Sequence, residues 1–153
     1  MTAYLDSGVL VKLYVKERGS AEAARVVKRH SQLPFSALHD LEIRNAIRAQ
    51  HGRGAITERQ MRAALEALDE DIESGRLERY APDWPGVFAL SEELSARHTG
   101  KLLCRALDIL HVATAVRRGD RLFVTADQRQ AALASAAGLR VRKLDPDRSP
   151  SAA

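Results

Sequence analysis

Short apolar runs alternate with long helical patterns along this 153-residue chain, and this alternation constrains its fold more than any other feature. We expect strands at residues 3–5, 33–35, 77–80, 121–124 and 140–144. The segments between these runs carry the apolar spacing and the end signals of helices. Strands that alternate with helices predict an α/β fold with a short, mostly parallel central sheet surrounded by helices.

Capping residues set the expected helix ends. Helices are predicted at about 7–14, 20–30, 37–53, 57–74, 83–98, 105–118 and 126–137, with Ser7, Thr57 and Asp83 as N-caps. The two helices between 37 and 74 are interpreted as an inserted pair on one side. Pro34 makes residues 33–35 a poor central strand. We expect one domain over residues 1–144 and a flexible tail at 145–153, which is rich in Pro, Ser, Asp and Ala.

Composition and charge limit the kinds of partner and cellular compartment to be expected for this protein. The formal net charge of +4 gives modest support to a partner with a phosphate backbone. Cys104 is the single cysteine, so an intramolecular disulfide is excluded, and a reducing cytoplasm is expected. The first residues lack the basic region of a signal peptide. No run of about eighteen apolar residues is present, so no membrane span is predicted.

Two aspartates follow predicted strands. Asp6 comes directly after the first strand, and Asp127 comes two residues after Thr125, at the end of the fourth. Ligands of open α/β sheets bind beyond the carboxyl ends of the strands. If these two strands are parallel neighbours, both carboxylates stand at the same edge of the sheet.

Two further acids lie on apolar helix faces. Asp108 and His111 are three residues apart in the nearly apolar segment 106–116, and Glu42 shares a row with Leu38 and Asn45. A buried carboxylate is costly unless it is paired or bound to a metal.

Ordinary roles are open for each of these residues. Asp127 could cap the helix that follows it, Asp108 could pair with Arg105, and Glu42 could form a salt bridge. His111 is interpreted as a core histidine paired with a backbone group, with a site-orienting role as the alternative. The convergence of four carboxylates at one end of one sheet argues against these roles.

Converging carboxylates need a counter-charge. Two of them about 5 Å apart repel by roughly 3 kcal/mol at an effective dielectric constant near 20. An all-oxygen ligand set favours Mg²⁺ or Mn²⁺ over zinc. A cation with open coordination positions can activate water beside a phosphodiester, so these residues indicate a nuclease.

Four segments carry a resemblance to a known family. Residues 4–14, 41–46, 107–113 and 124–127 resemble, in this order, the four acidic motifs of PIN domains, and the chain is most similar to VapC-type toxins. The resemblance implies a PIN-like fold and Asp6, Glu42, Asp108 and Asp127 as catalytic residues. It implies Asp6, Asp108 and Asp127 as metal ligands, with support from Ser7, Asn45 and Thr125. Gly8 stands where many such toxins have a second small polar residue.

The same resemblance implies a function. It implies an Mg²⁺- or Mn²⁺-dependent endoribonuclease, the toxin of a type II toxin–antitoxin pair, with RNA as substrate, a small antitoxin as partner and a homodimeric state. One alternative is a housekeeping PIN nuclease in RNA maturation. Another is a receiver-like phospho-acceptor domain, which Ser7 fits poorly because that class needs a second acid after the first strand.

Overall fold

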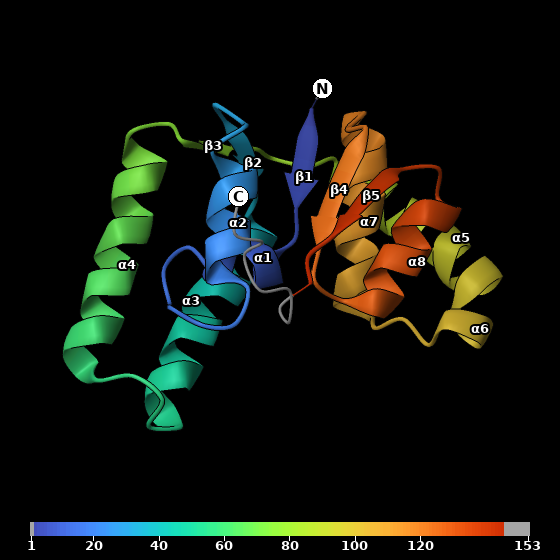
Figure 1. Ribbon diagram of the computed structural model, residues 1–153. Coiled ribbons are helices and arrows are strands. Elements are labelled where there is room, and N and C mark those ends of the chain that lie inside the picture. The colour runs from blue at the N-terminus through green and yellow to red at the C-terminus, as the bar shows by residue number, and fades with distance from the viewer. Residues whose placement is uncertain (1, 146–153) are drawn as a thin grey trace, which may run out of the picture. The chain divides into compact units, whose positions relative to one another are not determined.

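The computed structural model describes residues 2–145, and the chain divides into two compact units (Figure 1). The described residues of the first unit are 2–6 and 81–143, and those of the second are 7–80 and 144–145.

A three-stranded parallel sheet forms the centre of the first unit. Its strands are β1 (Ala3–Leu5), β4 (Leu122–Thr125) and β5 (Arg140–Lys143), in the order β1-β4-β5. Leu5 lies opposite Val124, and Thr125 lies opposite Lys143. All three residues of β1 are buried, as expected for a parallel strand that is covered on both faces.

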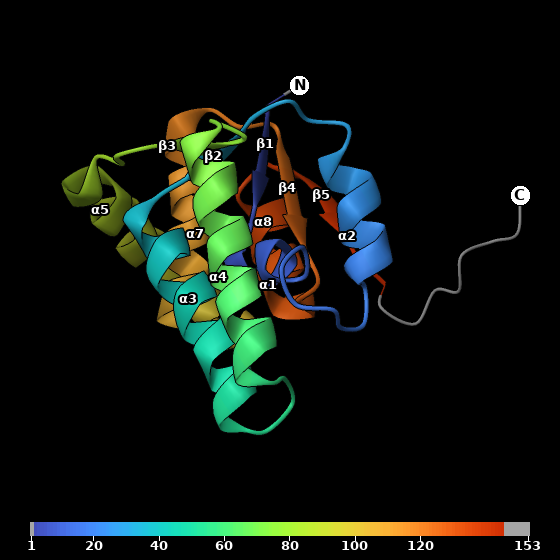
Figure 2. The same cartoon turned by 90° about the vertical axis from the view of Figure 1, so that its left-hand side faces the viewer.

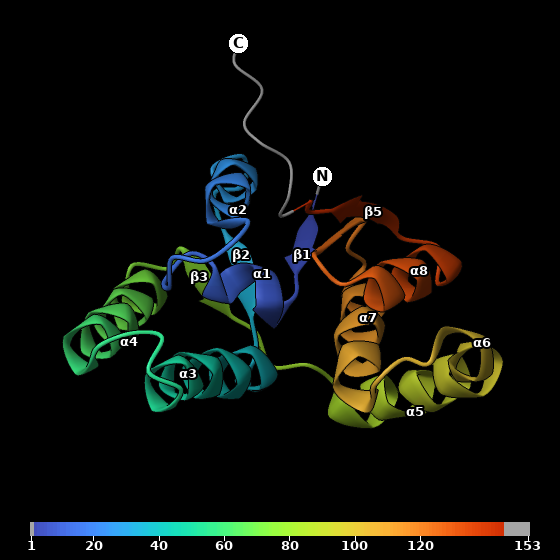
Figure 3. The same cartoon turned by 60° about the horizontal axis from the view of Figure 1, so that its bottom comes forward.

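Helices pack on this sheet. They are α5 (Trp84–Leu94), the π-helical segment Ser95–Thr99, α6 (Gly100–Leu102), α7 (Ala106–Arg118) and α8 (Gln128–Ala136). α7 packs against both α5 and α8 (Figure 3). The core joins the stacked rings of Tyr4 and Phe123 to Val112 of α7 and Leu133 of α8. Asp83 caps α5 as predicted, because its Oδ1 accepts the N–H of Gly86.

The second unit contains a two-stranded sheet and a helical hairpin. Its elements are α1 (Ser7–Val11), α2 (Ser20–Val27), β2 (Leu33–Phe35), α3 (Ala37–Gly52), α4 (Glu58–Glu73) and β3 (Leu77–Arg79). α3 and α4 lie side by side, as the inserted pair predicted from the sequence (Figure 2). Thr57 caps α4 in a capping box with Gln60.

The structure differs from the sequence-based expectation at three places. The five strands form two parallel sheets, and β2 pairs only with β3 among the described residues. The N–H of Leu33 donates to Arg76 and the carbonyl of Phe35 accepts from Tyr80, so Pro34, which lacks an N–H, is compatible with a strand that pairs on this one side. Ser7 is the first residue of α1 rather than its cap, and α1 ends at Val11. Apart from Asp145, the predicted flexible tail lies outside the described residues.

Candidate functional site

Asp6 lies at the carboxyl edge of the three-stranded sheet, as the sequence predicts. Its N–H donates to the carbonyl of Val124 at 3.1 Å, which continues the β1–β4 ladder by one residue. Its carboxylate is buried, with 6% of the residue exposed, and accepts the hydroxyl of Thr125 at 2.5 Å. Thr125 is fully buried at the end of β4. The two parallel strands therefore bring a carboxylate and a hydroxyl together at one edge.

Asp127 lies just beyond β4 and caps α8. Its Oδ1 accepts the N–H of Gln130 at 2.8 Å, and its own N–H donates to Thr125 Oγ1 at 3.0 Å. The capping role considered from the sequence is correct. It also ties Asp127 to the same hydroxyl that contacts Asp6, so the cap and the acidic edge share one hydrogen-bond network.

Asp108 lies in the first turn of α7 with 18% of its side chain exposed. Its Oδ2 accepts from Arg105 Nε at 3.1 Å, which is the pairing considered from the sequence. The Arg105 side chain is 76% exposed. A pair of this kind contributes little energy, so Arg105 holds Asp108 only weakly.

Gln130 is a residue of this network that the sequence analysis missed. It is 1% exposed, its Oε1 lies 2.8 Å from Thr125 Oγ1, and its Nε2 donates to the carbonyl of Asp108 at 3.3 Å. A signal was present, because Asp127 followed by a Gln three residues later is the capping-box spacing. Gln130 thus bridges β4 and α7 through buried hydrogen bonds.

Two of these acids affect the pKa of Cys104. Burial raises the pKa of its thiol, and the nearby carboxylates of Asp108 and Asp127 raise this pKa further, while Arg129 lowers it. The carboxylates of Asp108 and Asp127 therefore both lie near Cys104. The buried thiol belongs to the hydrophobic core, which agrees with a packing role.

Glu42, Ser7 and Asn45 belong to the second unit. Glu42 Oε1 accepts the Ser7 hydroxyl at 3.0 Å, and the supporting role of Ser7 at an acidic site stays a prediction. The core face of α3 carries His39, Ile43 and Ile47, and Glu42 lies beside it, half-buried. Asn45 is exposed. The three aspartates belong to the other unit, so the membership of Glu42 in one shared acidic site stays a prediction.

His111 is a core residue. It is 2% exposed, and its Nδ1 lies 2.7 Å from the Tyr4 hydroxyl. The core interpretation from the sequence holds, and a side-chain hydroxyl contacts the ring where only a backbone group was expected.

The acids of the first unit fit a hard divalent cation by their chemistry. Asp6, Asp108 and Asp127 offer carboxylate oxygens, the ligands that Mg²⁺ and Mn²⁺ prefer. Within residues 2–145, no group of three or more His, Cys, Asp or Glu side chains is assembled as a ready-made metal cluster. Their oxygens accept hydrogen bonds from Thr125, Arg105 and Gln130, so a bound cation would have to share or replace these contacts.

The fold and the edge define a class of protein. A short parallel sheet with helices packed on it, and aspartates beyond β1 and β4, is an α/β arrangement suited to binding a ligand at the carboxyl ends of the strands. The family model of the PIN domain matches residues 3–136. The chain therefore belongs to the PIN domain family, as the four motifs predicted, and this family is one of nucleases.

Solved structures agree with this assignment. The chain is similar to VapBC2 from Rickettsia felis bound to a DNA fragment from their promoter, with TM-score 0.64, 15% identity, and 95% of this chain and 100% of that chain covered. It is similar to FitAcB from Neisseria gonorrhoeae, with TM-score 0.63, 18% identity and coverages of 95% and 98%. A domain of a functionally unknown protein from Methanocaldococcus jannaschii aligns with TM-score 0.53, 15% identity and coverages of 99% and 96%.

These likenesses establish the fold. No curated protein matches the chain. Membership in a nuclease family removes the basis for the receiver-like alternative. No helix within residues 2–145 is both long enough and apolar enough to cross a membrane.

Proposed function

We propose that this protein is a metal-dependent endoribonuclease and the toxin of a type II toxin–antitoxin pair. The observation that carries the proposal is the buried contact between Asp6 and Thr125 at the carboxyl edge of β1 and β4, in a chain of the PIN domain family. Backbone contacts support the inclusion of Asp127 and Asp108, because the Asp127 N–H donates to Thr125 and the Asp108 carbonyl accepts from Gln130.

Asp6, Asp108 and Asp127 would hold Mg²⁺ or Mn²⁺. When bound, such a cation supplies positive charge beside the scissile phosphate and lowers the pKa of a water molecule. Without a cation, Thr125 holds the Asp6 carboxylate at the strand ends by its hydrogen bond, and the cap on α8 holds Asp127 at the end of β4. Rigid backbone elements on both sides of the edge keep the acids close to a productive arrangement.

Glu42 is proposed as the fourth acid, with Ser7 as the donor that orients it and Asn45 as its neighbour on α3. In this role the Glu42 carboxylate would act directly or through a water molecule. The half-buried position of Glu42 supports a function, because an acid kept only for solubility has no need of burial.

The partners are proposed from likeness. VapBC2 was solved with a DNA fragment from its promoter, and this chain carries the motifs of the VapC-type toxins. We therefore propose a small antitoxin as partner, a homodimer as the working form, RNA as substrate and the cytoplasm as location. The net charge of +4 supports a polyanionic substrate.

RNA cleavage by purified variants tests the proposal. Asp6→Asn and Asp108→Asn should abolish Mg²⁺- or Mn²⁺-dependent cleavage and also the growth arrest caused by expression. Glu58→Gln is the matched control, because Glu58 is an exposed acid that pairs with Arg62 on α4, and it should cleave like wild type. Sequencing the RNA ends after a short expression pulse would identify the target.

Two outcomes decide the proposal. Unchanged cleavage by both aspartate variants would refute the nuclease site. Cleavage without growth arrest, from a gene without a neighbouring antitoxin frame, would replace the toxin by a housekeeping nuclease of RNA maturation.

A further inference from the structure

Gln130 is a buried amide inside α8, on a helix that otherwise buries small and aliphatic side chains. Its buried neighbours along this helix are Ala131, Leu133 and Ala134. An amide in such a place is tolerated only when its polar atoms are hydrogen-bonded. Gln130 meets this condition with contacts to Thr125 and to the backbone of Asp108. The contacts lead directly to the acidic edge.

The orientation of the Gln130 amide is fixed by its surroundings. The carbonyl oxygen of Asp108 can only accept a hydrogen bond, so the atom facing it at 3.3 Å must be the donor Nε2. Oε1 is then the atom that lies 2.8 Å from Thr125 Oγ1. A flipped amide would set two acceptors against each other. Gln130 therefore presents an acceptor to the threonine hydroxyl.

Thr125 has one hydroxyl proton and two acceptors for it. Its oxygen already accepts the N–H of Asp127 at 3.0 Å. The proton can go to Asp6 Oδ2 or to Gln130 Oε1, and both oxygens lie within hydrogen-bond distance. A hydroxyl donates one hydrogen bond at a time. The two contacts are thus alternatives, and the hydroxyl can change from one to the other by rotating about its C–O bond.

We propose that Gln130 is a positioning residue that takes the Thr125 proton when Asp6 turns toward a divalent cation; this inference rests on the proposed metal-dependent function. Without a second acceptor, release of Asp6 Oδ2 would leave a buried hydroxyl proton unpaired, which opposes cation binding. With Gln130, the proton keeps a partner in both states.

Mn²⁺ affinity, measured by electron paramagnetic resonance of the free ion, tests this inference without relying on activity. Gln130→Met keeps the length of the side chain but removes the acceptor, and it should weaken Mn²⁺ binding about tenfold, as loss of an outer-shell partner does. Gln130→Asn, which withdraws the amide by one methylene, should weaken binding in the same direction. Thermal unfolding of each variant establishes that it is folded.

A second background separates positioning from simple structural damage. Thr125→Val removes the proton that Gln130 is proposed to accept, so Gln130→Met should change the Mn²⁺ affinity of this background less than twofold. Thr125→Ser keeps the hydroxyl, and there the loss should again be about tenfold. Equal losses in the valine and serine backgrounds, or no loss in the single variants, would overturn the role of Gln130.

The failure of the inference and that of the proposed function are distinguishable. A wild-type protein that binds Mn²⁺ and cleaves RNA, with Gln130→Met unchanged, overturns the inference alone. A wild-type protein that binds no Mn²⁺ at millimolar concentration overturns both.

Discussion

Asp6 and Asp127 at the sheet edge of the first unit differ in their kind of partner from Asp40 and Asp69 of the α3–α4 hairpin. In the hairpin, Arg44 lies 2.6 Å from both Asp40 and Asp69, and Arg79 lies 3.7 Å from Asp40. At the sheet edge, Asp6 accepts a threonine hydroxyl and Asp127 accepts a backbone N–H. Asp40 and Asp69 are therefore paired with cations, whereas Asp6 and Asp127 are held by neutral donors.

This difference separates two uses of a carboxylate. A guanidinium offsets part of the charge of the acids that it binds, and the hydrogen bonds to Asp69 and Asp40 raise the pKa of Arg44 against the opposing effect of burial. A neutral donor orients a carboxylate but leaves its negative charge available to a cation. Asp108 lies between these cases, because its partner Arg105 is largely exposed to solvent. The kind of partner, rather than burial alone, marks the candidate ligands.

The largest effect is expected from Asp6→Asn. This change keeps the shape and a hydrogen-bond partner for Thr125 but removes the charge, so RNA cleavage should fall on the order of 100-fold or more, while the protein stays folded. Initial rates at saturating Mn²⁺ provide the measurement, with circular dichroism as the check on folding. A loss of less than threefold would contradict the distinction between the two kinds of acid, because Asp6 would then behave like a structural acid.

Tyr14→Phe should have the next largest effect, on stability. Tyr14 donates to Asp71 Oδ2 at 2.6 Å, and burial, followed by this hydrogen bond, raises the pKa of its phenol. Loss of a hydrogen bond to a charged group should lower the free energy of unfolding by about 2 kcal/mol. Urea denaturation of the variant and of wild type measures this change in the free energy of unfolding.

Asp71 is an acid of the second unit that is held by a neutral donor. The Tyr14→Phe variant therefore tests whether a neutral donor alone marks an acid needed for cleavage. Cleavage by Tyr14→Phe per folded molecule should equal that of wild type. A large loss of cleavage would mean that neutral donors mark catalytic importance outside the sheet edge as well.

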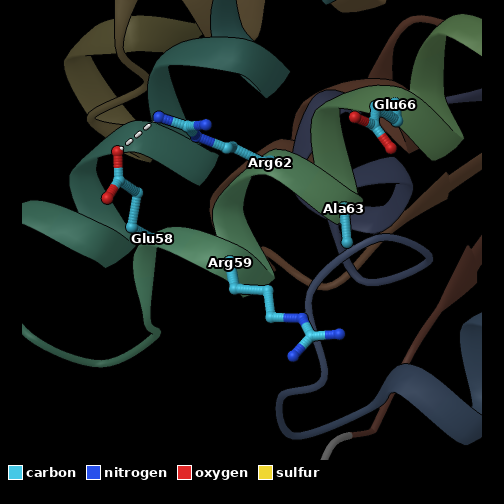
Figure 4. Close-up of a pocket in the computed structure, with 5 residues that line it drawn as sticks. All are labelled: Glu58, Arg59, Arg62, Ala63 and Glu66. Carbon is cyan, nitrogen blue, oxygen red and sulfur yellow. Dashed lines mark hydrogen bonds and ion pairs between the residues drawn. The ribbon is translucent and has the colours of Figure 1, made fainter.

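Arg44→Ala should destabilise the protein by about 1 kcal/mol, because it leaves Asp40 and Asp69 without a shared cation. The matched control is Arg62→Ala, which removes the exposed pair between Arg62 and Glu58 on α4 (Figure 4). This pair should contribute only about 0.3–0.5 kcal/mol. Equal losses in the two variants, measured by urea denaturation, would contradict a special role for the hairpin cluster.

The smallest effect is a pH dependence from Asp120. Burial raises the pKa of this carboxyl above its ordinary value, and Arg118, whose Nε lies 3.1 Å from Oδ2, partly offsets the rise. Between the ordinary and the raised pKa the folded protein binds more protons than the unfolded one, so stability falls as pH increases through this window.

Asp120→Asn removes this fall. The stability of the variant relative to wild type should therefore increase from acidic to neutral pH, as measured by thermal unfolding in a series of buffers. A difference that is constant with pH would contradict a raised pKa of Asp120 in the folded protein.

Much of the fold could be predicted because local signals set it. Thr57 and Gln60 fix the start of α4, and Asp83 with Pro85 fixes the start of α5. The apolar run before Asp6 and the run before Thr125 fix two neighbouring strands. The division of five strands into two sheets depends on pairing between distant segments, which no local pattern records. The π-helical segment Ser95–Thr99 also has no signal in its sequence.

The candidate site could be predicted in part for the same reason. Asp6 and Asp127 follow strands, so the register of β1 and β4 decides their place. Gln130 was missed because its role depends on which buried atoms surround it, and these come from β4 and α7. Whether Glu42 joins the three aspartates depends on how the two compact units are arranged. Helical periodicity in the sequence carries no information on that arrangement.

β5 has a consequence for solubility. It is an outer strand of its three-stranded sheet, and Arg140, Arg142 and Lys143 occupy three of its four positions. If β5 of a second copy of this chain paired with this edge, its cations would lie beside those of the first copy. Such repulsion discourages edge-to-edge aggregation. The cations of β5 therefore discourage self-association through the backbone of this edge.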